Sequence, residues 1–587
     1  MVGTRKKMAA MVAVALVAGS QTSALTCSVV SGSCYTGSQY KLQTISDVTD
    51  PSVCCTRCNQ TVGCTLWQIA HTGCILRNGF SSAVPGNCTR SDGVGPTPPP
   101  SPPPPPAPPA PPVPPPLGYK PNIIFFLADD YGHYNMGWRG NKEARTPNMD
   151  TLVADGIILD RHYVYQYCSP TRSSLLSGRL PIHVNTENTD ADTPSGVDIR
   201  MTTMADKLQL AGYYTAHSGK WHAGGSCTKN LPVNRGFNKS IGYLSGAEDH
   251  YTQRVGRAVD LWEDDGPAYG KNGTYGGYTY TNHTLQAIAS VDADTPLFIY
   301  HAWQECHTPN EVDAEYLQTN ASFQPYFPLR QVFEGMAHFM DSHIGTIVDA
   351  LKAKNMFDKT LIVFSSDNGG REDKGFGGNN YPLRGMKFTD FEGGTRVAAW
   401  ASGGVIPQSM RGTSVSHLIH ICDWYGTFAY LAGVDPVDHA AAAAALPPID
   451  SHNTWPILSQ NASSGRTTIV LSSNAIIQWP YKLVQTNQGG KGWWTSTHHP
   501  NASQPDIKDD NSGCPNGCVF NIESDPSEYT DLSATVPAVK ANLTAALGAA
   551  MSTRFQVAST PGYTKCVTAV QFELEHEGFL GPICSKG

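Results

Sequence analysis

Three short apolar runs in the chain end abruptly in polar side chains. They occupy Asn122–Ala128, residues 296–302 and residues 360–365. The first run ends in Asp129 and Asp130, and the third is followed by the polar stretch 366–370. This length and continuous apolar character are typical of parallel strands buried on both faces, which deliver the residues that follow them to one edge of the sheet. The runs therefore predict a buried parallel sheet with carboxylates at its carboxyl edge.

Segments with helical periodicity lie between these runs, most clearly at residues 203–211 and 331–351. Strands that alternate with helices predict an α/β domain with a large, mostly parallel central sheet flanked by helices, and sites in such domains gather where the strands end. Further along, short alternating strands at 468–471, 481–484 and 518–522 predict a small antiparallel sheet packed on the main domain.

The N-terminus has the order of a secretory signal peptide. Basic residues 5–7 precede an apolar stretch over 8–18, and small residues follow up to Ala24. This order predicts a signal peptide over 1–24 that is removed after Ala24. The apolar stretch is too short to span a bilayer and no later segment is long and apolar enough, so we expect no membrane span.

The chain has 16 cysteines and many glycosylation sequons, which agree with export. Cysteines in this number suit an oxidising compartment. Sequons of the type Asn-x-Ser/Thr occur at Asn59, Asn87, Asn238, Asn272, Asn282, Asn320, Asn461, Asn501 and Asn542. Together with the signal peptide they predict a secreted glycoprotein, located outside the cell, in the cell wall or in the periplasmic space.

Half of the 16 cysteines lie between Cys27 and Cys88. An even number at this density predicts a disulfide framework that holds a module over 25–92, which is too small for a sufficient core. Zinc binding is the alternative, but an oxidising compartment and the lack of a companion histidine pair disfavour it. The Cys-Cys-x-x-Cys pattern that begins at Cys54 resembles PAN/apple-like modules, which implies a carbohydrate or protein ligand.

A proline-rich segment over 93–118 separates this module from the rest of the chain. Its composition favours an extended polyproline helix without internal hydrogen bonds, which acts as a semi-rigid spacer. The run resembles hydroxyproline-rich stretches of plant and green-algal wall proteins, which implies glycosylation and an extracellular-matrix setting. A ligand for SH3-type domains is the competing interpretation, and the secretory setting argues against it.

Length and charge limit the organisation of the chain and its partners. The 587 residues exceed what one hydrophobic core usually organises, so we expect at least two compact units. The formal net charge of −8 leaves no excess of Lys and Arg to neutralise phosphates. We therefore expect no nucleic-acid partner.

Residues 168–179 carry the most specific pattern, Cys-Ser-Pro-Thr-Arg-Ser-Ser-Leu-Leu-Ser-Gly-Arg. A disulfide is the structural alternative for Cys168, but a random cysteine would rarely carry the whole string. The string resembles the signature of formylglycine-dependent (type I) sulfatases, Cys-x-Pro-x-Arg followed by Thr/Ser-Gly-Arg. In that family a dedicated enzyme oxidises the cysteine to formylglycine, an aldehyde that hydrates to a geminal diol. The resemblance implies that Cys168 is modified and that the formylglycine-generating enzyme is a partner during maturation.

The resemblance covers residues 119–587 and is closest to the arylsulfatase B (N-acetylgalactosamine-4-sulfatase) branch. The segments that recur there in the same order are 122–132, 219–222, 296–309, 366–370, 382–387, 392–394 and 520–532. This implies an alkaline-phosphatase-like sandwich, with a catalytic domain over 119–456 and a C-terminal subdomain over 457–587. Loops such as 370–380 differ from the lysosomal relatives, so no sugar preference is carried over.

The resemblance assigns two sets of site residues. Those implied to bind one Ca²⁺, together with the diol of residue 168, are Asp129, Asp130, Asp367 and Asn368. Those implied to hold the diol or surround the sulfate are Arg172, Lys220, His222, His307 and Lys387, with His301 as the alternative to His307. Oxygen ligands independently favour calcium or magnesium over zinc. A divalent cation with Arg, Lys and His side chains suits an anionic sulfate ester.

These residues support a concrete mechanism of sulfate-ester hydrolysis. One diol hydroxyl, deprotonated with help from the cation and Asp367, attacks the sulfur while Lys387 or His307 protonates the departing alcohol. His222 then takes the proton of the second hydroxyl, which expels sulfate and restores the aldehyde. The expected substrates are aryl sulfates, sulfated carbohydrates or both.

Two rival functions are weighed against this one. A phosphatase or phosphodiesterase of the alkaline phosphatase superfamily is disfavoured, because such enzymes normally use Ser or Thr as nucleophile with two zinc ions. A non-catalytic extracellular-matrix binding protein is suggested by the cysteine-rich module and the proline spacer. Retention of every expected catalytic position argues against that alternative.

The large domain contains eight of the cysteines, and leaving out Cys168 gives an odd number, so at least one further cysteine is expected to be unpaired within the domain. Cys514 and Cys518 are close enough in sequence to pair, provided that the backbone brings their Cβ atoms together.

Overall fold

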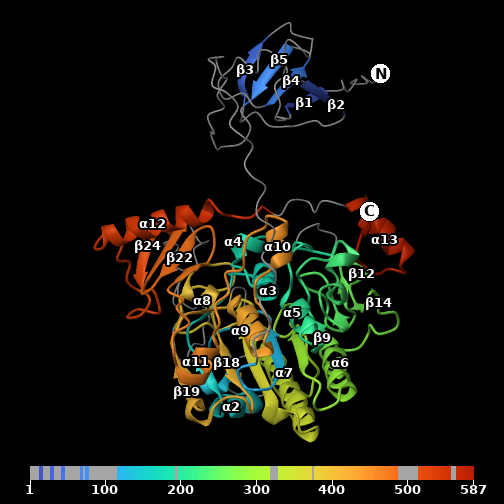
Figure 1. Cartoon of the computed structure of the whole chain (residues 1–587), viewed down its shortest axis with the longest axis vertical. Coiled ribbons are helices and arrows are strands. Elements are labelled where there is room, and N and C mark those ends of the chain that lie inside the picture. Colours follow the sequence, from blue (N-terminus) through green and yellow to red (C-terminus); the bar gives the residue numbers. More distant parts are fainter. Residues whose placement is uncertain are drawn as a thin grey trace. The chain divides into compact units, whose positions relative to one another are not determined.

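The structure, a computed structural model, describes residues 115–191, 196–317, 328–372, 376–486, 513–556 and 563–586, and the backbone of five short strands nearer the N-terminus (Figure 1). Its residues divide into two units, Met1–Pro104 and Pro105–Gly587. The division falls within the predicted proline-rich linker. The predicted boundary between residues 456 and 457 is not tested by this division and stays a prediction.

The first unit contains an antiparallel sheet in the order β2-β1-β4-β5-β3. Its strands are β1 (Val12–Leu16), β2 (Cys27–Ser31), β3 (Lys41–Ile45), β4 (Leu66–Ala70) and β5 (Gly73–Arg77). Strand β1 lies in the stretch for which the sequence predicts a signal peptide, and that peptide stays a prediction. The predicted disulfide framework of the module lies outside the described side chains.

A ten-stranded sheet forms the centre of the second unit, in the order β14-β13-β10-β9-β15-β6-β16-β18-β7-β19. Its parallel middle consists of β10 (Lys239–Gly242), β9 (Tyr214–Gly219), β15 (Leu297–Ala302), β6 (Asn122–Ala128) and β16 (Thr360–Ser366). The edges contain antiparallel pairs and consist of β13 (Trp262–Glu263), β14 (Gly266–Pro267), β18 (Ala399–Ser402), β7 (Ile157–Leu159) and β19 (Thr413–Val415). The three predicted parallel strands are confirmed as β6, β15 and β16.

Helices cover both faces of this sheet (Figure 1). One face packs against α3 (Cys168–Ser177), α5 (Met204–Leu210) and α9 (Asp423–Ala432). The other face packs against α2 (Pro147–Ala154), α6 (Gly276–Ser290) and α7 (Pro328–Ala353). Along β6, Phe125 joins the first core and Phe126 the second. Because successive side chains of β6 enter opposite cores, the strand reads as a continuous apolar run rather than an alternating one.

The predicted helices are present, with slightly different ends. Helix α5 lies within the predicted 203–211 and begins after Thr203, which forms a capping box with Asp206. This exchange of hydrogen bonds satisfies backbone N–H groups of the first turn and fixes the start of the helix. Helix α7 is longer than the predicted 331–351 at both ends.

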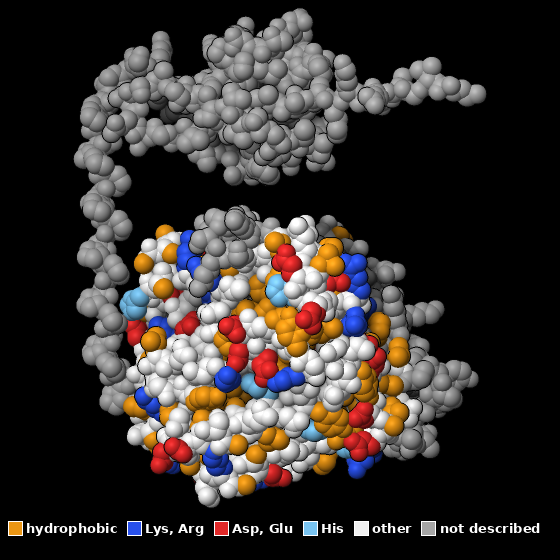
Figure 2. Space-filling view, turned by 90° about the vertical axis from the view of Figure 1, so that its right-hand side faces the viewer, with side chains coloured by type: hydrophobic (Ala, Val, Ile, Leu, Met, Phe, Trp, Pro, Cys, Tyr) orange, Lys and Arg blue, Asp and Glu red, His pale blue; other side chains and the backbone are white. Residues whose placement is uncertain are grey.

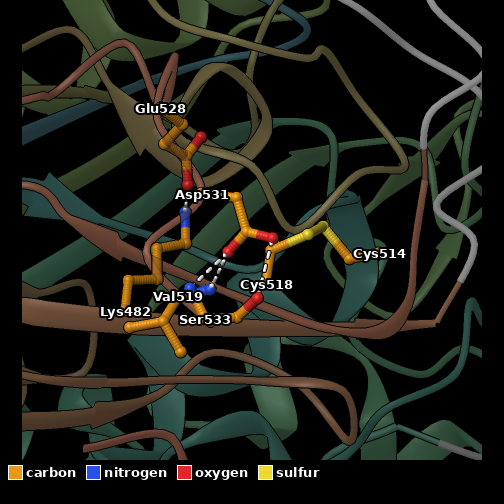
Figure 3. Close-up of a disulfide and its surroundings, with 7 residues drawn as sticks. All are labelled: Lys482, Cys514, Cys518, Val519, Glu528, Asp531 and Ser533. Atoms are coloured by element: carbon orange, nitrogen blue, oxygen red, sulfur yellow. Dashed lines mark hydrogen bonds and ion pairs between the residues drawn. A yellow bond between two sulfur atoms is a disulfide. The ribbon is translucent and has the colours of Figure 1, made fainter. Parts of the chain in front are cut away.

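The predicted C-terminal antiparallel sheet is also confirmed. It consists of β21 (Thr468–Val470), β22 (Ala475–Gln478), β23 (Tyr481–Thr486) and β24 (Cys514–Asn521), and helix α12 (Pro537–Met551) packs against it. A disulfide joins Cys514 and Cys518, whose Cα atoms are 5.3 Å apart, as the spacing predicts. Figure 3 shows this disulfide beside Asp531, whose carboxylate accepts a hydrogen bond from the backbone N–H of Val519 (3.0 Å).

The prediction that at least one cysteine besides Cys168 is unpaired in the large domain is confirmed among the described residues. Cys227, Cys306 and Cys422 are buried and free, as is Cys168. Cys168 is therefore not held in a disulfide, which was the structural alternative for this position.

A buried ion-pair cluster joins the C-terminal sheet to the segment before β17 (Arg396–Val397). Lys482 on β23 lies 2.9 Å from Glu392 and 3.0 Å from Glu528, and the three side chains are fully buried. The Tyr163 hydroxyl donates to the second oxygen of Glu392 at 2.9 Å. Figure 3 shows Lys482 and Glu528 side by side. The cluster fixes the end of the segment that carries Lys387.

Among the helices of the described residues, none is long and apolar enough to cross a membrane. On the face of the second unit drawn in Figure 2, acidic and basic side chains are interspersed with apolar ones.

Candidate active site

Two neighbouring parallel strands bring two pairs of polar residues together. In the register of β6 and β16, Ala128 is opposite Ser366, so Asp129 and Asp130 follow one strand at the level where Asp367 and Asn368 follow the other. The Asn368 amide donates to Asp130 Oδ1 at 2.7 Å. All four side chains are buried. The edge of the sheet thus carries three carboxylates and an amide in a small volume.

Cys168 is the first residue of α3 and lies at this edge. Its Sγ is 3.7 Å from Asp129 Oδ1 and 3.4 Å from Lys387 Nζ. Ligand atoms of Asp129, Asp130, Cys168 and His307 all lie within 4.8 Å of one another. The structure therefore gathers the predicted nucleophile and predicted metal ligands in one cluster.

Three cationic side chains each contact a carboxylate of the cluster. Arg172, one turn after Cys168 on α3, donates to Asp367 Oδ2 through Nη2 at 2.7 Å. Lys220 Nζ lies 2.6 Å from Asp129 Oδ2. Lys387 Nζ lies 2.6 Å from Asp130 Oδ1. A buried charge is stable only when it is paired, and all three cations also interact electrostatically with Cys168.

Burial and neighbouring charges set the protonation of these groups. Burial, and next the Asp367 carboxylate, raise the pKa of the Cys168 thiol to about 12, although Lys220 and Lys387 oppose this. Burial works against ionised Asp130, but Lys387 and His307 lower the pKa of this carboxyl. At neutral pH residue 168 would therefore be a protonated thiol if it stayed cysteine, whereas Asp130 stays ionised.

The three candidate histidines occupy different places. His307 Nε2 is 3.8 Å from Asp130 Oδ2, so His307 belongs to the cluster. His301 lies on β15, where its Nδ1 bonds the Thr284 hydroxyl at 2.8 Å and its ring packs on Trp303. Of the two alternatives in this part of the sequence, His307 is the one beside the predicted metal ligands.

His222 follows Lys220 after β9 and has a backbone φ of 47°. Burial, and then the positive charge of Lys220, hold its pKa well below the usual range, so the ring is neutral. Its Nδ1 is buried and has no hydrogen-bond partner among the described residues. A Cβ built on Gly246 would come within 2.9 Å of the His222 ring, so this glycine is needed for the close packing.

The donor set suits a hard divalent cation. Carboxylate oxygens of Asp129 and Asp130 are available beside Asn368, whose Oδ1 is buried without a hydrogen-bond partner in the described part of the chain. Calcium and magnesium prefer carboxylate and amide oxygens. The unpartnered amide oxygen is therefore consistent with a ligand role for Asn368.

Two aromatic residues beside the cluster were not predicted as site residues. Tyr167 directly precedes Cys168, and Phe388 directly follows Lys387; their ring centroids are 6.2 Å apart. The sequence offered one indication that they lie at the site, which is that each is adjacent to a predicted site residue. The apolar side chains themselves gave no indication, because most such residues belong to a core.

Comparison with known proteins identifies the family. The family model described as Sulfatase matches residues 121–434. Arylsulfatase J of Mus musculus is 31% identical over 451 residues, which are 72% of this chain and 74% of that protein. The chain belongs to the sulfatase family. This sulfatase is also 29% identical to arylsulfatase A of Homo sapiens, over 53% of the chain and 64% of that relative.

The solved structures agree with this assignment. A crystal structure of Ps i-CgsB in complex with k-i-k-neocarrahexaose aligns with a TM-score of 0.62 and 27% identity, covering 75% of the sulfatase and 94% of that chain. The sulfatase has the predicted alkaline-phosphatase-like α/β fold, with a large mixed central sheet and a small C-terminal antiparallel sheet. Membership of the 4-sulfatase branch stays a prediction.

Proposed function

We propose that this member of the sulfatase family is a secreted hydrolase of sulfated carbohydrates that works through formylglycine at position 168 and one Ca²⁺. The observation that carries the proposal is the position of Cys168, buried between Lys387 and Asp129 with its pKa raised to about 12 by burial first and by Asp367 next. A thiol that holds its proton is a poor nucleophile, so conversion to another nucleophile accounts for its place in the cluster.

Formylglycine, once hydrated, would supply one hydroxyl that attacks sulfur and a second that allows sulfate to leave. A divalent cation would be held by Asp129, Asp130, Asp367 and Asn368 and would supply positive charge beside the reacting oxygens. Arg172 and Lys220 would orient residue 168, since their contacts with Asp367 and Asp129 fix both cations next to it.

Lys387 and the two histidines take different roles in this proposal. Although burial disfavours charged Lys387, the attraction of Asp130 raises its pKa, which suits a permanent charge on a sulfate oxygen rather than a proton donor. Proton transfer to the departing alcohol then falls to His307. Burial lowers the pKa of His307, and the carboxylates of Asp129 and Asp130 oppose this by stabilising the protonated ring. Neutral His222 is suited to accept the proton of the second hydroxyl, because burial and then Lys220 lower its pKa.

Sulfated carbohydrates are favoured as substrates by the relatives. N-acetylgalactosamine-6-sulfatase of Homo sapiens is 28% identical over 58% of the chain and 66% of that enzyme, and the neighbouring crystal structure holds a neocarrahexaose. The predicted signal peptide and sequons favour an extracellular, cell-wall or periplasmic location. The formylglycine-generating enzyme would act on the chain before it is exported, and the N-terminal module would bind carbohydrate or protein.

Two measurements test the proposed function. Mass spectrometry of the peptide that contains residue 168, from chain produced in a formylglycine-competent host, should find the aldehyde in place of the thiol. Sulfate release from a sulfated oligosaccharide should then exceed phosphate release from an aryl phosphate by orders of magnitude. An intact thiol at residue 168 in material that turns over sulfate esters would contradict the proposal, and a dominant phosphate release would favour the phosphatase alternative.

A further inference from the structure

The turn that carries Lys387 directs two neighbouring side chains in opposite ways. Lys387 is buried in the cluster, whereas Phe388 is 47% exposed. The turn is closed by Thr389, whose N–H donates to Met386 O at 3.0 Å and whose hydroxyl donates to the same oxygen at 2.8 Å. A half-exposed aromatic ring lacks part of the hydrophobic stabilisation that most such rings gain from burial, and this one lies beside a buried group of the proposed site.

The backbone of Phe388 is held in a conformation that a bulky side chain rarely adopts. Its φ is 73°, in the left-handed region. Its N–H donates to Gln166 O at 2.7 Å, which ties this turn to the segment that leads into Cys168. Strained non-glycine residues of this kind persist where the surrounding structure fixes them, and they cluster at ligand-binding sites. The strain here points the ring outward rather than into the core.

The Phe388 ring lies next to the position of the reacting ester. Lys387 Nζ is 5.3 Å from the ring centroid and 3.4 Å from Cys168 Sγ. Tyr167 flanks the same ring, with the centroids 6.2 Å apart and the planes inclined by 41°. An ester whose sulfate group contacts Lys387 and residue 168 can therefore place its alcohol part against this exposed ring.

We propose that Phe388 is a specificity-determining residue whose ring stacks on the sugar ring that carries the sulfate ester, an inference that rests on the proposed function. A pyranose ring presents an apolar C–H face with slight positive charge, which matches the negative face of a phenyl ring. Hydroxyl groups at the rim of the sugar stay in water. This platform, the exposed ring of Phe388, gives no advantage to an ester of a small acyclic alcohol.

The test compares Phe388→Ala and Phe388→Tyr with wild type on three esters: a carrageenan oligosaccharide, 4-nitrophenyl sulfate and methyl sulfate. We expect Phe388→Ala to lower kcat/KM for the oligosaccharide about tenfold, mainly through KM, since the lost contact is made equally in ground and transition states. Phe388→Tyr keeps the ring and should restore wild-type values. Methyl sulfate should be affected less than about twofold.

Tyr269→Ala is the matched control, because Tyr269 is similarly exposed at 49% and contacts the ring of Phe579 instead of the cluster. It should leave all three esters unchanged. An equal loss for methyl sulfate in Phe388→Ala would show that Phe388 only supports Lys387, and a loss confined to 4-nitrophenyl sulfate would assign the platform to aryl rings. Either result overturns the proposal.

A binding measurement separates this inference from the proposed function. Calorimetry measures the affinity of the carrageenan oligosaccharide for the full chain with Cys168→Ala, with and without Phe388→Ala. Since neither variant turns over, the difference in affinity is the contribution of the Phe388 ring to binding. About tenfold weaker binding without the ring supports the platform even if wild type releases no sulfate, a result that would contradict only the proposed function. Equal affinity of the two variants contradicts the platform even if wild type is active.

Discussion

At the scale of single residues, the candidate active site depends on buried charges whose partners lie far apart in the sequence. Lys387 illustrates this, because its Nζ contacts Asp130 at 2.6 Å and Cys168 Sγ at 3.4 Å. The lysine therefore neutralises a predicted metal ligand and faces the predicted nucleophile at once. Removing its charge should lower catalysis and, because Asp130 is then left without this buried partner, also the free energy of unfolding.

Lys387→Met keeps the length of the side chain and removes the charge. We expect kcat/KM for sulfate esters to fall by about 10²–10³-fold, the usual cost of losing one group that stabilises developing negative charge. Steady-state kinetics measures this, with Lys352→Ala as control because Lys352 is an exposed lysine of α7. A loss below about fivefold would remove Lys387 from the catalytic set.

Buried His162 gives a prediction for the pH dependence of stability. Burial lowers its pKa to about 3, and its Nε2 accepts a hydrogen bond from Trp424 Nε1 at 3.0 Å. As the pH falls below about 6.5, the histidine takes up a proton in the unfolded chain but not in the folded one. Between pH 6.5 and about 3, the free energy of unfolding of wild type therefore decreases by about 1.4 kcal/mol per pH unit through His162.

His162→Gln lacks this titration. It should be destabilised at pH 7, where it loses packing, and its deficit in free energy of unfolding should narrow as the pH is lowered from 6.5 toward 3. Denaturant unfolding of both proteins at a series of pH values measures the difference. A deficit that is constant over this range would mean that His162 titrates alike in the folded and unfolded states.

At the scale of elements, the C-terminal sheet is coupled to the segment that carries Lys387 through Lys482. This lysine of β23 pairs with Glu392 and Glu528 in a fully buried cluster, and Glu392 follows Lys387 by one short turn of chain. Burial raises the pKa of Glu528 to about 7, although Lys482 opposes this. The sheet therefore contributes both stability and the position of the Lys387 segment.

Lys482→Met should lower the free energy of unfolding by about 3–5 kcal/mol, because it leaves buried carboxylates without their cation. The double variant with Glu392→Gln should recover part of this loss, since one uncompensated charge is then absent. Chemical denaturation measures both. If the single variant loses less than about 1 kcal/mol, water or protonation compensates the carboxylates and the coupling is weak.

At the scale of the whole molecule, a cation at the sheet edge would join β6, β16 and the start of α3. Such a ligand binds the folded chain and not the unfolded one, so it stabilises the fold by mass action. The chain is divided into two units between residues 104 and 105. Only the second unit contains the described cluster.

Removal of Ca²⁺ with a chelator should lower the unfolding temperature, and restoring Ca²⁺ to 100-fold above its Kd should return about 2.7 kcal/mol of stability. Differential scanning calorimetry measures the shift. In Asp130→Asn the shift should shrink, whereas Asp349→Asn, at a carboxylate whose side chain is 79% exposed, should behave as wild type. Equal shifts in wild type and Asp130→Asn would place the cation elsewhere.

Part of the fold and of the site could be predicted because the relevant signals are local. The run Asn122–Ala128 with Asp129 after it predicts a buried strand and a carboxylate at its end, and both are present. The pairing of Cys514 with Cys518 follows from their short separation. The outward ring of Phe388 could not be predicted, because it depends on the turn around Thr389 and on the carbonyl of Gln166.

The sequence by itself determined which elements form and which residue types follow them, since apolar periodicity and the string at 168–179 are properties of neighbouring positions. Only the tertiary structure decided which cation pairs with which carboxylate, and that His307 rather than His301 lies beside Asp130. The physical reason is that these contacts depend on the register of parallel strands joined by long crossovers, which brings residues from distant segments to one edge.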